Sequence, residues 1–120
     1  MADHNLIGEQ GEAIAKDYLQ KKGYEIITAN CRFQKAEIDI ITTYKNQLVI
    51  VEVKTRTSEE FESPKEAVTI PKQKRIVKAA DAYIQEKKID LECRFDIISV
   101  LIQGNKINVE HIEDAFSPML

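Results

Sequence analysis

Two runs rich in isoleucine and valine, residues 36–43 and 47–54, constrain the fold of this chain most. The segment Tyr44-Lys45-Asn46-Gln47 between them looks like a turn, so the two runs are predicted to pair as an antiparallel hairpin. Side chains alternate between the two faces of a strand. The valines of the second run are therefore expected to face a core, while Glu52 and Lys54 share the opposite face.

Hydrophobic periodicity predicts the remaining elements in the order α-β-β-β-α-β-β with a compact sheet. The pattern alone leaves an α/β and an α+β class open. Asn5 is the expected cap of the first helix, and Lys21-Lys22-Gly23 is its expected stop. The predicted segments are helices at 5–22 and 71–87, a helical turn opened by Ser63-Pro64-Lys65-Glu66, strands at 24–28, 94–102 and 106–112, and a loose tail at 113–120.

Composition excludes several classes of protein. The 120 residues, 43% of them hydrophobic, match a single globular domain spanning 1–120. No apolar stretch approaches the roughly 18 residues that cross a bilayer, and the first residues resemble no secretory signal. We therefore expect a cytoplasmic protein with no membrane partner. Cys31 and Cys93 show no CxxC spacing, which argues against a disulfide framework or a zinc site, and His4 and His111 look incidental.

The charge distribution limits how nucleic acid could bind. A formal net charge of −3 disfavours wrapping by the whole surface, so binding would need a local basic patch. The clearest basic cluster is Lys72, Lys74, Arg75 and Lys78, in the first half of the predicted helix at 71–87. Such a cluster is more often the solvated side of an amphipathic helix than a phosphate track.

Acidic residues converge in the predicted hairpin. A turn at 44–47 sets Asp39 opposite Glu52 and Glu37 opposite Lys54 on one face. Facing carboxylates repel each other and need a compensating cation, and Mg²⁺ accepts one or two carboxylates together with water and phosphate oxygens. Lys54 would then steer the attacking water or stabilise the developing phosphorane charge. Glu37 has the supporting role of a salt bridge to Lys54.

The first helix offers a further acid. Glu12 lies at the margin of the apolar face, beside Leu19, whereas Glu9 falls on the solvated side. Glu12 is therefore the better candidate for an additional metal ligand. A Glu-x-Lys motif alone is common on solvated strands, and it gains weight here because Glu12 and Asp39 precede it in this order.

Three segments carry a resemblance to a known family: Gly8-Glu9-Gln10-Gly11-Glu12, Ala36-Glu37-Ile38-Asp39-Ile40-Ile41 and Val51-Glu52-Val53-Lys54-Thr55-Arg56. They resemble the bacterial YraN-like family, which is similar to the restriction-endonuclease-like superfamily and to archaeal Holliday junction resolvases. The superfamily pattern is an Asp followed by Glu-x-Lys on the next strand. The resemblance covers almost the whole chain and departs from the family at Ala36 and Glu62, where the family usually has Gly.

The resemblance implies an α/β, restriction-endonuclease-like core with a mixed central sheet flanked by helices. It also implies that Mg²⁺ or Mn²⁺ is bound by Asp39, Glu52, the carbonyl of Val53 and Glu12, and that Lys54 activates water. Resolvase-like relatives act as dimers, which would make a second copy a partner, although no residue here marks the interface. The expected nucleic-acid contacts are Arg56, Lys72, Gln73, Lys74 and Arg75.

Three functions remain open. The first is a metal-dependent endonuclease acting on DNA, in preference to structured RNA, and on branched or repair intermediates. The second is a module that binds nucleic acid or a partner without cutting, because fold does not fix function. The third is a structural role in a larger complex, with the acids forming only a salt-bridge network. Metal affinity separates the first function from the third.

Overall fold

A computed structural model describes residues 2–58 and 63–118, with side chains from Leu6 onward. The order of elements confirms the predicted α-β-β-β-α-β-β, with a short helix where the helical turn was expected. No helix within these two ranges is long and apolar enough to span a membrane. The elements are α1 (Ala2–Lys21), β1 (Glu25–Phe33), β2 (Ala36–Tyr44), β3 (Gln47–Arg56), α2 (Pro64–Ala67), α3 (Ile70–Lys87), β4 (Glu92–Gln103) and β5 (Lys106–Phe116).

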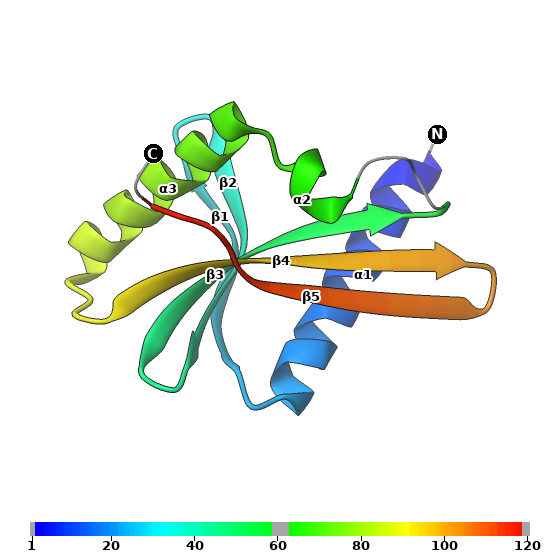
Figure 1. Ribbon diagram of the computed structural model, residues 1–120, viewed down its shortest axis with the longest axis horizontal. Coiled ribbons are helices and arrows are strands. Elements are labelled where there is room, and N and C mark those ends of the chain that lie inside the picture. Colours follow the sequence, from blue (N-terminus) through cyan, green and yellow to red (C-terminus); the bar gives the residue numbers. More distant parts are fainter. Residues whose placement is uncertain (1, 59–62, 119–120) are drawn as a thin grey trace.

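The strands form one sheet in the order β1-β2-β3-β4-β5 (Figure 1). Neighbouring strands are antiparallel except β3 and β4, which are parallel. The chain connects this parallel pair through α2 and α3, since parallel neighbours require a crossover. At the β2–β3 turn Lys45 and Asn46 both have positive φ, 48° and 64°, as a two-residue type I′ turn requires. The mixed sheet with flanking helices confirms the predicted α/β class.

Helices α1 and α3 cover opposite faces of the sheet (Figure 1). On the α3 side, Ile50 of β3 belongs to the same core cluster as Ile76 of the helix. On the α1 side, Val51 packs in a second cluster with Leu19. Strand β3 is thus buried from both sides as far as Val51, and its polar part begins at Glu52.

Three predicted boundaries differ from the structure. Helix α1 begins at Ala2, so Asn5 lies inside the helix and is not its cap; alanine is the strongest helix former and allows this early start. Strand β1 continues past residue 28 because it pairs with β2 along its length. The expected loose tail is wrong for 113–116, which end β5, because Phe116 is buried and stacks on Phe95 with ring centroids 5.1 Å apart.

A buried polar network joins β4 to β5 on the α1 side. The carboxylate of Asp96 is fully buried, accepts hydrogen bonds from Arg94 at 2.9 and 2.8 Å, and lies 2.7 Å from Nε2 of His111. Burial alone would raise the pKa of Asp96, but hydrogen bonds from His111 and Arg94 outweigh burial and lower it. The prediction that His111 is incidental is therefore wrong, and the side chain of His4 lies outside the described residues.

Candidate active site

Asp39 and Glu52 lie where strands β2 and β3 separate. Backbone pairing of the two strands extends to Ile40 opposite Val51, and the same register brings Asp39 beside Glu52. Past that point the carboxylate of Asp39 accepts a hydrogen bond from the Val53 N–H, with an Oδ2–N distance of 2.8 Å. A side chain thus takes over from the backbone in linking the two strands.

The regular alternation of β2 is interrupted at Asp39. Ile38 packs in the cluster on the α3 side, whereas Ile40 packs in the cluster on the α1 side. In an unbroken strand these two residues would share a face. As a result, Asp39 borders two pockets, one against α1 and the other against α3.

The pKa of the Asp39 carboxyl group is perturbed by its surroundings. Burial, followed by the charge of Glu52, raises the pKa of Asp39 to about 8, against the lowering effect of the Val53 N–H. Two carboxyl groups that share a desolvated site cannot both ionise cheaply. The pair therefore retains a proton near neutral pH or takes up a cation.

One cation comes from the protein itself. The ammonium nitrogen of Lys72 lies 2.6 Å from Oε2 of Glu52. Helix α3 starts at the cap Thr69, whose side chain accepts the Lys72 N–H, and this start places Lys72 over β3. The Glu52 side chain is 6% exposed and that of Lys72 is 35% exposed, so the carboxylate is enclosed while the ammonium borders solvent. Lys72, which is predicted to contact nucleic acid, is thus paired with a predicted metal ligand.

The pocket on the α1 side contains the third acid. It is open, has a volume of about 730 Å³, and is lined by Glu12, Asn30 and Asp39 among others. Oε1 of Glu12 accepts a hydrogen bond of 2.9 Å from Nδ2 of Asn30 and lies 3.6 Å from Nζ of Lys16. The charge of Glu12 contributes to the raised pKa of Asp39, after burial and Glu52. Among the described residues no three His, Cys, Asp or Glu side chains converge closely enough to hold a metal ion together.

The other site residues predicted in the hairpin make different contacts from those expected or lie in a different pocket. Lys54 shares the Glu52 face of β3 and makes no ion pair with any residue that the structure describes. The predicted salt bridge between Glu37 and Lys54 is wrong, because Oε2 of Glu37 lies 3.5 Å from Nε of Arg32 on the adjacent strand β1. Val53 lines the pocket on the α1 side.

Basic side chains surround the acid pair from the α3 side. A cavity of about 220 Å³ is lined by Lys35, Lys72 and Arg75 together with Asp39 and Glu52. Glu37 lines the same cavity, so three basic and three acidic side chains meet there.

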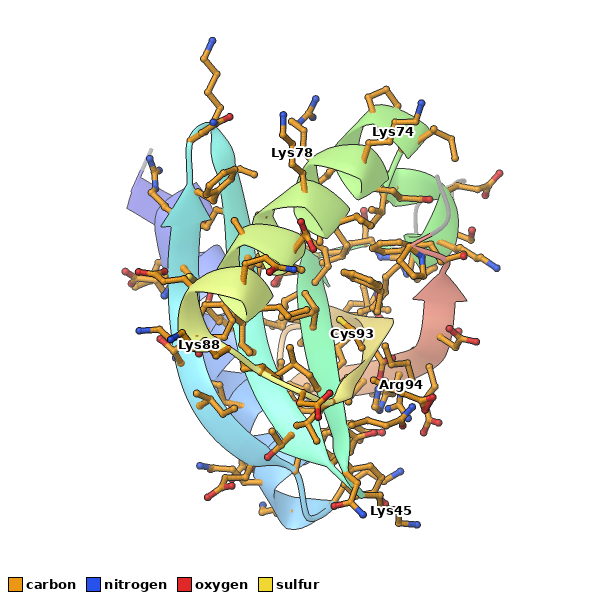
Figure 2. All side chains as sticks on the ribbon, turned by 90° about the vertical axis from the view of Figure 1, so that its left-hand side faces the viewer. Lys45, Lys74, Lys78, Lys88, Cys93 and Arg94 are labelled. Atoms are coloured by element: carbon orange, nitrogen blue, oxygen red, sulfur yellow. The ribbon has the colours of Figure 1, made fainter. Side chains whose placement is uncertain are left out.

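The remaining predicted nucleic-acid contacts differ in their surroundings. Lys74 is exposed on α3, as is Lys78 of the same basic cluster (Figure 2), and both border a pocket that Cys93 and Phe95 of β4 also line. Arg56 is half-buried at the end of β3. Gln73 is 7% exposed, and its amide donates a 3.0 Å hydrogen bond to the carbonyl of Val68, so it secures the α2–α3 connection.

Two residues that line the site, Asn30 and Lys35, were not predicted from the sequence. Asn30 lies outside the predicted strand at 24–28, and only its positive φ of 54° marks it as special. Asparagine is one of the few residues that tolerate this conformation, which gives a weak signal. Lys35, in the β1–β2 turn, showed no pattern at all. Glu62, which stands where the resembled family usually has Gly, lies outside the described residues.

Comparison with known proteins places the chain in a family. Residues 11–100 match the model of the "Uncharacterised protein family UPF0102". The chain is 51% identical to a UPF0102 protein of Flavobacterium psychrophilum over 116 residues, covering 97% of this chain and 98% of the relative. It is 48% identical to a UPF0102 protein of Bacteroides thetaiotaomicron over 120 residues, covering 100% and 99%, respectively. These matches show that the chain belongs to the UPF0102 family, the YraN-like family that its motifs resemble.

Proposed function

We propose that this chain is a divalent-metal-dependent endonuclease that hydrolyses phosphodiester bonds in DNA, in preference to structured RNA. The observation that carries the proposal is the pair formed by Asp39 and Glu52, two adjacent carboxyl groups of which one has its pKa raised to about 8. Mg²⁺ and Mn²⁺ bind one or two carboxylates and complete their shells with water and phosphate oxygens. The donor set of this site fits such an ion.

The chain's own residues have distinct roles in this proposal. Asp39 and Glu52 would hold the metal with the Val53 carbonyl, and Glu12, which lines the pocket on the α1 side, would act on the ion through bound water. When bound, the ion supplies positive charge that acidifies water and polarises the phosphate. Lys54, on the same face as Glu52, would stabilise the negative charge that develops on the phosphate. Asn30 keeps Glu12 oriented through its 2.9 Å hydrogen bond.

The charge distribution supports approach of the substrate from one direction. The net charge of −3 repels nucleic acid from most of the surface. Lys35 and Arg75 lie close to the acid pair, and Lys74 and Lys78 extend beyond them on α3. Lysines contact phosphates without reading bases, so we expect recognition of nucleic-acid shape more than of sequence.

The decisive experiment measures metal binding and cleavage side by side. Mg²⁺ and Mn²⁺ would be titrated by calorimetry into the native chain, Asp39→Asn and Glu52→Gln, while the same proteins are incubated with branched and linear duplex DNA. We expect both variants to lose metal binding and to cleave at least about 100-fold more slowly. Glu92→Gln is the matched control, because Glu92 is an exposed carboxylate at the start of β4, and it should behave like the native chain.

A second function is favoured by one contact. The ion pair of Lys72 with Glu52 already neutralises the enclosed carboxylate without metal, which suits a module that binds nucleic acid and does not cut it. Salt-sensitive DNA binding that is independent of metal, with no heat of metal binding near millimolar concentration and no cleavage, would replace the nuclease proposal with this one.

A further inference from the structure

The contact between Lys72 and Glu52 is unusual for a surface ion pair. Its 2.6 Å distance joins a carboxylate that is 6% exposed to an ammonium that is 35% exposed. Only the ammonium can return to water without first moving the protein around it. If Lys72 left with nothing in its place, Glu52 would remain as an enclosed and unpaired charge, which is strongly unfavourable.

The position of Lys72 in its helix adds to this asymmetry. Lys72 lies in the first turn of α3, where the helix dipole repels a positive charge, and this first turn contains no acidic residue. The ammonium is therefore held at this end of the helix by Glu52, across the gap between α3 and β3. A competing cation at Glu52 would remove the interaction that keeps it there.

A place for the released ammonium lies beside the pair. The cavity on the α3 side is lined by Lys35, Lys72 and Arg75, and its volume of about 220 Å³ is large enough for a phosphate group. Lys35 and Arg75 line that cavity independently of Lys72, but so do Glu37, Asp39 and Glu52, so a phosphate there needs the divalent ion to offset the carboxylates. A third cation there would strengthen phosphate binding without any movement of the backbone.

We propose that Lys72 is an exchangeable internal counter-ion, which occupies the place of the metal at Glu52 in the free protein and moves to a phosphate of the nucleic-acid substrate when a divalent ion binds. This inference rests on the proposed function, since it concerns the same acid pair. Lys72 lowers the affinity of the site for metal alone and raises its affinity for the phosphodiester. Metal and substrate thereby become coupled ligands.

The test compares Lys72→Met with Lys74→Met. Methionine keeps much of the side-chain length but removes the charge, and Lys74 is an exposed lysine on the same helix (Figure 2). Calorimetry with Mg²⁺ and Mn²⁺ in the absence of DNA should show about tenfold tighter binding for Lys72→Met, because a competing unit charge is gone. Lys74→Met should bind metal like the native chain. Affinity for duplex DNA in Ca²⁺ should fall in Lys72→Met.

A second measurement is made on the native protein and holds if Lys72→Met does not fold. The side-chain ammonium groups of the native protein can be observed by ¹H–¹⁵N NMR during a Mg²⁺ titration, with Lys72→Arg used only to assign the signal. We expect the Lys72 signal to shift as the ion binds, whereas the Lys74 signal stays in place.

The outcomes separate this inference from the function on which it rests. If the native chain binds metal and Lys72→Met binds it no more tightly, Lys72 is not a counter-ion of the site and the nuclease proposal survives. An unchanged Lys72 ammonium signal at saturating Mg²⁺ has the same meaning. If neither protein binds a divalent ion, both proposals are abandoned.

Discussion

Asp39 has two roles that conflict at neutral pH. Its carboxylate accepts the Val53 N–H and so links β2 to β3 where their backbone pairing ends. The same carboxyl group is desolvated beside Glu52, which raises its pKa to about 8. Linking the strands favours the ionised form, whereas burial and Glu52 favour the protonated form. The second effect is larger, so ionising Asp39 costs folding free energy when no metal is present.

We therefore predict that the metal-free Asp39→Asn variant becomes more stable relative to the metal-free native chain as the pH rises. A pKa raised from 3.8 to about 8 means that the stability from the protonated group is complete below pH 4 and is lost as the pH rises towards 8. The free energy of unfolding of the native chain should fall relative to the variant by up to about 1.4 kcal/mol per pH unit in this window, since one proton is involved.

Urea denaturation in the presence of a chelator, at several pH values between 4 and 9, measures this difference. Asp17→Asn is the control, because Asp17 is 62% exposed and forms a surface ion pair with Lys21, and its difference from the native chain should not grow with pH in this way. A difference for Asp39→Asn that stays constant from pH 5 to pH 9 would show that Asp39 ionises at its ordinary pKa.

At the scale of the element, the position of Glu12 depends on how closely α1 packs on β3. Gly11 of α1 is buried, and a Cβ added to it would lie 1.9 Å from Oγ1 and 2.8 Å from Cβ of Thr55. Rotation of the threonine side chain relieves the first overlap but not the second. Only glycine at position 11 lets the helix approach the strand so closely, and this approach sets the distance between Glu12 and the acid pair.

We predict that Gly11→Ala destabilises the fold by about 1–3 kcal/mol and weakens metal binding, because α1 must move away from β3. Gly8→Ala is the matched control on the same helix: nothing lies within 4 Å of its added Cβ, and alanine should stabilise the helix by up to about 1 kcal/mol. Thermal and urea unfolding of the two variants measure the effect. Equal stabilities would mean that α1 does not rest on Thr55.

The elements also show what could be predicted from the sequence. The β2–β3 register, and with it the Asp39–Glu52 pair, follows from a short turn and a period of two, both of which are local. The burial of Phe116 depends on Phe95, and the pairing of Lys72 with Glu52 depends on how α3 crosses the sheet. Such contacts are set by tertiary packing and leave no periodic signal, which is why the tail and the role of Lys72 were not predicted.

At the scale of the whole molecule, a chain of net charge −3 must orient any nucleic acid that it binds. Figure 2 shows Lys74 and Lys78 on α3 at one end of the view, and Lys45 in the β2–β3 turn at the other. The acid pair lies toward the α3 end, because it follows the last paired residues Ile40 and Val51, far along the hairpin from that turn. Lys74 and Lys78, at the same end, are therefore placed to contact a phosphate backbone whose scissile group reaches Glu52.

We predict that removing positive charge from α3 weakens DNA binding more than removing the same charge elsewhere on the surface. Lys74→Gln combined with Lys78→Gln should reduce the slope of log affinity against log salt by about 2, since each lost phosphate contact contributes about 0.9. Lys45→Gln combined with Lys88→Gln removes the same charge from exposed positions away from the acid pair and should leave the slope almost unchanged. Binding would be measured by fluorescence anisotropy at several salt concentrations, with Ca²⁺ in place of Mg²⁺. Equal losses in the two double variants would mean that DNA responds only to total charge, and the α3 surface would then have no special part in binding.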